Sequence, residues 1–210
     1  MKRTILPFLA VLLIPSCAGS SSSQRALSGA TQQATLADRN PLQIPPFDDL
    51  KNRPGVKVSA DGRSLQFPGG VTMSDGGTFG VDNSGHGAVL CAWEEYLGVK
   101  KMTELCASTG DKAFNARINK AIDRINDFIV VNSLSPITKG DLEQQAEALL
   151  GQVYPSPRGA AQKEAVHKEC TTGDFIHIIT TYKSMSPEDF NHHVDDLLSV
   201  PRPPVTAPCL

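Results

Sequence analysis

The stretch that decides the fold is DKAFNARINKAIDRINDFIVV, residues 111–131. Its apolar residues recur every three or four positions, which places them on one face of an α-helix. They are Phe114, Ile118, Ala121, Ile122, Ile125, Phe128 and Ile129. The other face is polar, and Asp111 offers a side-chain oxygen to the N–H groups of the first turn. We therefore predict an amphipathic helix that buries its apolar face, since such burial is the usual source of helix stability.

A second helix is predicted over residues 88–107, with an interruption near Gly98. Its apolar residues include Trp93, the only tryptophan of the chain. We expect this helix to face the helix of residues 111–131 and to place Trp93 in the core between them.

Four cysteines lie in the part of the chain that carries these helices. Cys91 and Cys106 are 15 residues apart, which on an unbroken helix corresponds to about 22 Å. A disulfide needs Cα atoms within roughly 7 Å of each other. The two can pair only if the chain folds back near Gly98, and otherwise each pairs with Cys170 or Cys209. We favour the second arrangement and predict two disulfides.

Further helices are predicted over residues 138–154, 160–170, 175–185 and 186–198. The last has the clearest start signal, because Ser186 can cap it and Pro187 fits its first turn. Residues 55–68 alternate apolar and polar around Asp61-Gly62, which predicts a β-hairpin. The expected fold is mainly α, a disulfide-stapled bundle of about five helices with a small N-terminal β-hairpin.

The first residues have the pattern of a secretory signal: Lys2 and Arg3 precede an apolar run over residues 5–14. The sequence LIPSC at residues 13–17 resembles the lipobox of bacterial lipoprotein precursors. The resemblance implies that Cys17 carries a lipid and becomes the mature N-terminus. It also implies the outer membrane, because no Asp follows the cysteine. The alternative is an ordinary cleaved signal and a soluble periplasmic or secreted protein.

These patterns divide the chain into a signal peptide, a tether and one domain. The expected bounds are 1–16 for the signal peptide, 17–45 for a disordered Ser- and Pro-containing tether, and 46–210 for a single helical domain. Within that domain we expect the hairpin 55–68, a Gly-rich loop 69–87, helices over 88–200 and a Pro-rich tail 201–210.

The Gly-rich loop is the candidate ligand-binding segment. Ser84, Gly85, His86 and Gly87 lie at the start of a predicted helix, where backbone N–H groups can bind an anion. No known phosphate-binding glycine motif is present, so a plain surface loop is the other interpretation. An enzyme would use His86 with Ser84 or Glu94, although Gly-x-Ser-x-Gly is absent.

A metal site is the remaining alternative, because His167 and Cys170 lie one helical turn apart and His177 follows. An exported protein more often oxidises its cysteines, which favours disulfides over a metal. We expect no cofactor.

Composition argues against some partners. The net charge is −2 and aromatic residues make up 6% of the chain, which is little for binding nucleic acid. We expect an exported, lipid-anchored envelope protein with a non-catalytic binding or structural role. Its partner would be an envelope protein or a cell-surface component. An envelope enzyme using His86 and a metal-handling module are the alternatives.

Overall fold

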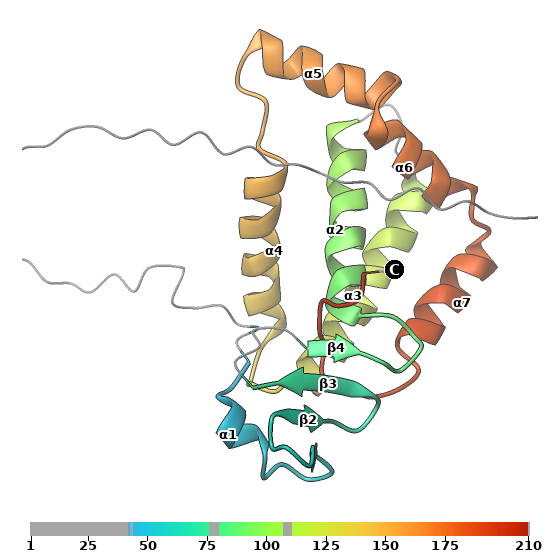
Figure 1. The fold of residues 1–210 in the computed structure, drawn as a ribbon. Coiled ribbons are helices and arrows are strands. Elements are labelled where there is room, and N and C mark those ends of the chain that lie inside the picture. Colours follow the sequence, from blue (N-terminus) through green and yellow to red (C-terminus); the bar gives the residue numbers. More distant parts are fainter. Residues whose placement is uncertain (1–41, 43, 76–79, 107–110, 210) are drawn as a thin grey trace, which may run out of the picture. The chain divides into compact units, whose positions relative to one another are not determined.

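The computed structural model describes residue 42 and residues 44–75, 80–106 and 111–209. These residues form seven helices and four strands (Figure 1). The helices are α1 Phe47–Leu50, α2 Val89–Leu105, α3 Lys112–Asn132, α4 Lys139–Val153, α5 Ala160–Thr171, α6 Asp174–Ser184 and α7 Pro187–Leu197. The strands are β1 Lys57–Val58, β2 Ser64–Gln66, β3 Val71–Ser74 and β4 Gly80–Asp82. The mainly helical fold with a small sheet is thus confirmed, whereas the expected signal peptide, Cys17 and nearly all of the tether lie outside the described residues.

The two helices predicted first pack against each other at the centre of the bundle. Trp93 of α2 is 1% exposed and donates from Nε1 to Asn126 Oδ1 of α3 at 2.7 Å. The buried residues of α3 include most of the predicted apolar face, among them Ile125 and Ile129. The prediction that these faces form the core is confirmed.

Gly98 does not interrupt α2, which is where the structure differs from the sequence-based expectation. A Cβ atom at this position would lie 3.2 Å from the hydroxyl oxygen of Tyr154. The glycine therefore allows the end of α4 to approach α2 closely, which is a tertiary reason for a glycine inside a helix.

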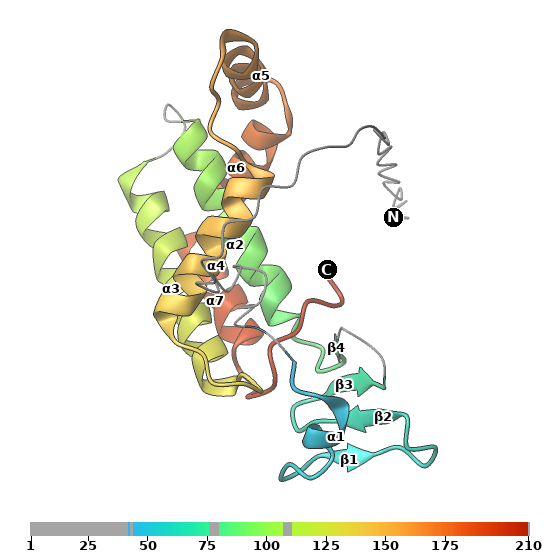
Figure 2. The ribbon, with the colours of Figure 1, turned by 90° about the vertical axis from the view of Figure 1, so that its left-hand side faces the viewer.

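The remaining long helices surround this pair. α4 begins with a capping box between Thr138 and Asp141, which satisfies backbone N–H groups at the helix start. α7 begins as predicted, with Ser186 accepting from the Asp189 N–H and Pro187 in the first turn. Figures 1 and 2 show α4 and α7 beside the α2–α3 pair.

The sheet is antiparallel with strand order β1-β2-β3-β4. The predicted hairpin corresponds to β1 and β2, and Gly62 in its turn has φ +70°. Residues 69–87, however, are not entirely a loop, because they contain β3 and β4. These strands are only three or four residues long and lie among glycines, so the local sequence carries no clear strand signal. Their pairing and the burial of Val71 and Met73 stabilise them instead.

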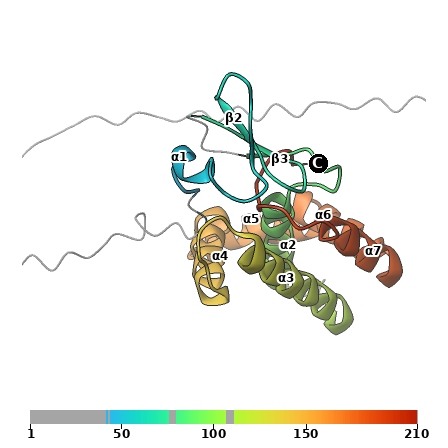
Figure 3. The ribbon, with the colours of Figure 1, turned by 90° about the horizontal axis from the view of Figure 1, so that it is seen from below.

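The C-terminal tail connects the sheet to the start of α2. The Leu90 N–H donates to Val205 O at 3.0 Å, and the Asp82 N–H donates to Ala207 O at 2.7 Å. Ala207 of the tail also forms a parallel bridge with Val81 of β4, and Figure 3 shows the tail on the side of the helices where the sheet lies. The tail therefore covers the N-terminal end of α2.

Two disulfides hold opposite ends of α2. Cys91, in its first turn, is bonded to Cys209 of the tail, with Cα atoms 5.5 Å apart. Cys106, which follows its last turn, is bonded to Cys170 of α5, with Cα atoms 5.4 Å apart. The prediction that Cys91 and Cys106 each pair with a distant cysteine is confirmed. Among the described helices, none has the length and apolar character needed to cross a lipid bilayer.

Candidate functional site

The predicted ligand loop, Ser84 to Gly87, joins β4 to α2 and is held by its own hydrogen bonds. The Ser84 N–H donates to Asp82 Oδ1 at 2.8 Å, and the His86 N–H donates to Ser84 Oγ at 3.1 Å. Gly85 and Gly87 both have positive φ angles, which glycine adopts without strain. These bonds occupy N–H groups that a bound anion would require, so the geometry does not favour an anion site here.

A buried ion pair fixes this loop to the rest of the domain. Arg202 Nε donates to Asp82 Oδ2 at 2.5 Å, and the two side chains are 0% and 1% exposed. The guanidinium also donates to the backbone oxygens of Gly87, Leu197 and Val200 at 2.7–3.0 Å. One arginine thus joins β4, the loop, the end of α7 and the tail.

The electrostatics of Asp82 follow from these contacts. Burial alone would raise the pKa of its carboxyl group, but hydrogen bonds from Ser84 and Arg202 outweigh burial and lower the pKa. Asp82 therefore stays ionised in the core, where its charge is paired. Its role is structural, because its oxygens are directed at Ser84 and Arg202.

The ring of His86 contacts residues that the sequence did not suggest. Its Nδ1 lies 3.0 Å from Asp196 Oδ1 and 3.4 Å from Ser199 Oγ. In a hydrolase triad the acid and the nucleophile contact different ring nitrogens, whereas here both contact the same one. Ser84, the predicted partner, instead accepts from the His86 backbone. This arrangement holds the end of α7 to the loop and is not a catalytic triad.

The residues of the metal alternative do not come together as a metal site. Cys170 is bonded to Cys106, so it has no thiolate to offer. Among the described residues there is no group of three or more His, Cys, Asp or Glu side chains placed to hold an ion. His167 instead lines a pocket.

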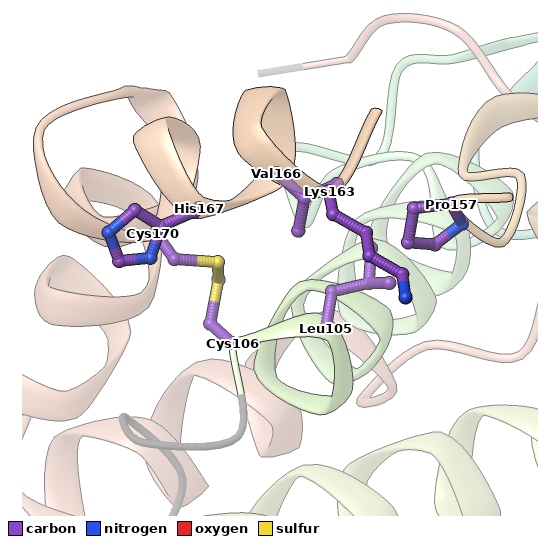
Figure 4. Close-up of a pocket in the computed structure, with 7 residues that line it drawn as sticks. All are labelled: Leu105, Cys106, Pro157, Lys163, Val166, His167 and Cys170. Carbon is purple, nitrogen blue, oxygen red and sulfur yellow. A yellow bond between two sulfur atoms is a disulfide. The ribbon is translucent and has the colours of Figure 1, made fainter. Parts of the chain in front are cut away.

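That pocket, of about 380 Å³, lies between α5 and the C-terminal end of α2 (Figure 4). It is lined by Leu105, Cys106, Pro157, Lys163, Val166, His167 and Cys170. Its four residues from α5 share one helical face, because Val166 and His167 each lie three or four positions from Lys163 and from Cys170. The sequence shows this stripe, but the opposite wall comes from α2 and the segment before α5. Only the folded chain therefore reveals the pocket.

Comparisons of this chain with protein-family models, with curated proteins and with solved structures found no significant match.

Proposed function

We propose that this protein is exported and held by a lipid on Cys17 at the periplasmic face of the outer membrane. Its folded domain acts there as a non-catalytic binding module. The partner is an envelope protein or another component of the cell surface, and the tether gives the domain its reach.

The pairing of all four described cysteines is the observation that carries this proposal. Cys91–Cys209 and Cys106–Cys170 join segments that are 118 and 64 residues apart in sequence. Such bonds persist in oxidising compartments and are rare in the cytosol. They agree with the secretory signal at the start of the chain, which is an independent feature of the sequence.

Binding is favoured over catalysis by what the polar side chains do. The Ser84–Gly87 loop, Asp82 and Arg202 form a structural clamp, and the partners of His86 share one ring nitrogen. The pocket beside α5, by contrast, is open and combines apolar walls with basic side chains. That combination is typical of a ligand site.

The test is the intact mass of the protein purified from its own envelope, before and after reduction and alkylation. We expect a diacyl- or triacyl-sized addition at Cys17 and four further cysteines that are alkylated only after reduction. A Cys17→Ala variant should lose the added mass and leave the membrane fraction while keeping both disulfides. An oxidised but lipid-free protein would refute the anchor, and reduced thiols in a cytosolic protein would refute export.

A further inference from the structure

α5 is attached to the domain in an unusual way. None of its 12 residues is buried, although isolated helices of this length are marginal in water. It contacts α6, and the Cys106–Cys170 disulfide ties it to the end of α2. The disulfide therefore holds a helix that does not pack closely, and the pocket is the space that remains beneath it (Figure 4).

The walls of this pocket are largely apolar. Leu105, Pro157, Val166 and Cys170 are each only half-buried, so each keeps part of its apolar surface exposed. Leu105 comes from α2, whereas Val166 and Cys170 come from α5. An apolar group placed between the two helices would cover all of these surfaces, which is a favourable change in water.

Two basic side chains lie on the same face of α5. Lys163 and His167 are one helical turn apart, and neither side chain has a hydrogen-bond or ion-pair partner within the described part of the chain. Glu164, which follows Lys163 in the sequence, is exposed, whereas two other acidic side chains of these helices have partners elsewhere. Glu104 pairs with Lys101 at 3.5 Å, and Glu169 accepts from the Asp174 N–H at 2.9 Å.

We propose that this pocket binds a small organic anion, specifically a carboxylate that carries an apolar group. The acid group pairs with the Lys163 amine, and the apolar group packs against Leu105 and Val166. The ring of His167 lies at the other end of the pocket, beyond the Cys106–Cys170 disulfide (Figure 4). A volume of about 380 Å³ is near the lower end of ligand pockets, which suits a short acyl chain or a single aromatic ring. The proposal deepens the binding role proposed above and rests on it.

Octanoate is a suitable probe, titrated into the oxidised full-length protein and followed by backbone amide shifts. We expect saturable shifts at residues 163–170 and at the end of α2. Octan-1-ol has the same chain without the charge, and acetate has the charge without the chain. Both should bind at least about tenfold more weakly than octanoate, because each lacks either the charged or the apolar contact.

Two variants of the same helix separate the proposed contact from general effects. Lys163→Met keeps the side-chain stem but removes the charge, and should weaken octanoate binding about 10- to 100-fold. Lys168→Met removes an exposed charge that does not line the pocket, and should leave affinity unchanged. Circular dichroism and thiol counting should show that both variants keep α5 and the disulfide.

Several results would overturn the proposal. These are the absence of saturable octanoate binding, equal affinity for octan-1-ol, and equal effects of the two lysine variants. Lys163→Met would also do so if it lowered thermal stability but left affinity intact, since Lys163 would then serve only the end of α2. Failure of octanoate to bind would not change the intact-mass result for the exported protein. The ligand proposal and the export proposal can therefore be refuted independently.

Discussion

Replacing Arg202 by Met should destabilise this domain more than removal of any surface charge. Methionine retains much of the side-chain length but none of the donors. The change leaves the Asp82 carboxylate, whose side chain is 1% exposed, without its ionic partner. It also leaves three backbone oxygens without the donors that Arg202 supplies.

The size of the effect follows from the burial of both partners. Removing one member of a buried ion pair typically costs about 3–5 kcal/mol. In a domain of this size each kcal/mol moves the melting temperature by roughly 2–4 °C. The Tm of Arg202→Met should therefore fall by about 6–20 °C.

Urea unfolding followed by tryptophan fluorescence measures this loss directly, because Trp93 is the only tryptophan and is 1% exposed. Arg124→Met is the matched control. Arg124 pairs with Asp195, but their side chains are 34% and 63% exposed, and such pairs contribute about 0–1 kcal/mol. If Arg202→Met lost no more stability than Arg124→Met, the reasoning would be refuted.

The pH dependence gives a second check. The pKa of Asp82 is lowered in the folded protein, so its stabilising contribution is present above the unfolded pKa of about 3.9. That contribution is lost as pH falls through the lower folded value. In Arg202→Met, burial without the arginine favours protonation of Asp82. The difference in unfolding free energy between the wild type and Arg202→Met should therefore be largest near neutral pH and become smaller below about pH 4.

Three further predictions follow from other contacts. In a variant with Cys106 and Cys170 both replaced by serine, the backbone amides of α5 should exchange hydrogen rapidly while those of α3 stay protected, because α5 buries no residue of its own. Exchange protection of α5 equal to that in the wild type would contradict this. Burial raises the pKa of all three tyrosines, Tyr96, Tyr154 and Tyr182. The pKa of Tyr96 reaches about 12, so the contribution of the tyrosines to the unfolding free energy should be constant below about pH 10 and fall as pH rises further. Tyrosinate absorbance at about pH 10 in the folded protein would contradict this prediction. Asn126→Leu should cost about 1–3 kcal/mol in urea unfolding, because it leaves the buried Trp93 N–H unpaired; an unchanged midpoint would show that this hydrogen bond contributes nothing.

The helices were predictable because their signals are local. In α3 the apolar face repeats with the helical period, and Asp111 accepts from the Phe114 N–H as a helix cap does. Ser186 and Pro187 mark the start of α7 in the same way. Each of these signals involves residues within a few positions of one another.

The second half of the sheet was not predictable in this way. β3 and β4 are three or four residues long and lie in a glycine-rich segment. Val71 and Met73 do alternate, but two apolar residues do not distinguish a strand from a loop. Their strand geometry depends on pairing with β2 and on burial against the tail and α2.

The candidate sites were predictable only in part. His86 was recognised as a polar residue in an unusual loop, but its contact Asp196 is 110 residues away. The pair His167 and Cys170, one turn apart in α5, is visible in the sequence, where together with His177 it suggested a metal site. The pocket also requires Leu105 from α2, and no sequence pattern indicates that this residue lies beside α5.

The sequence by itself determined the long helices of the bundle, the caps of α3 and α7, the β-hairpin, and that four cysteines are present for two disulfides. Only the tertiary structure decided which cysteines pair, that Arg202 is buried beside Asp82, and that a pocket remains under α5. The physical reason is the separation along the chain over which each interaction acts. Caps and periodic faces act within a turn or two of helix, whereas a buried charge pair or a pocket exists only when distant segments meet and exclude water.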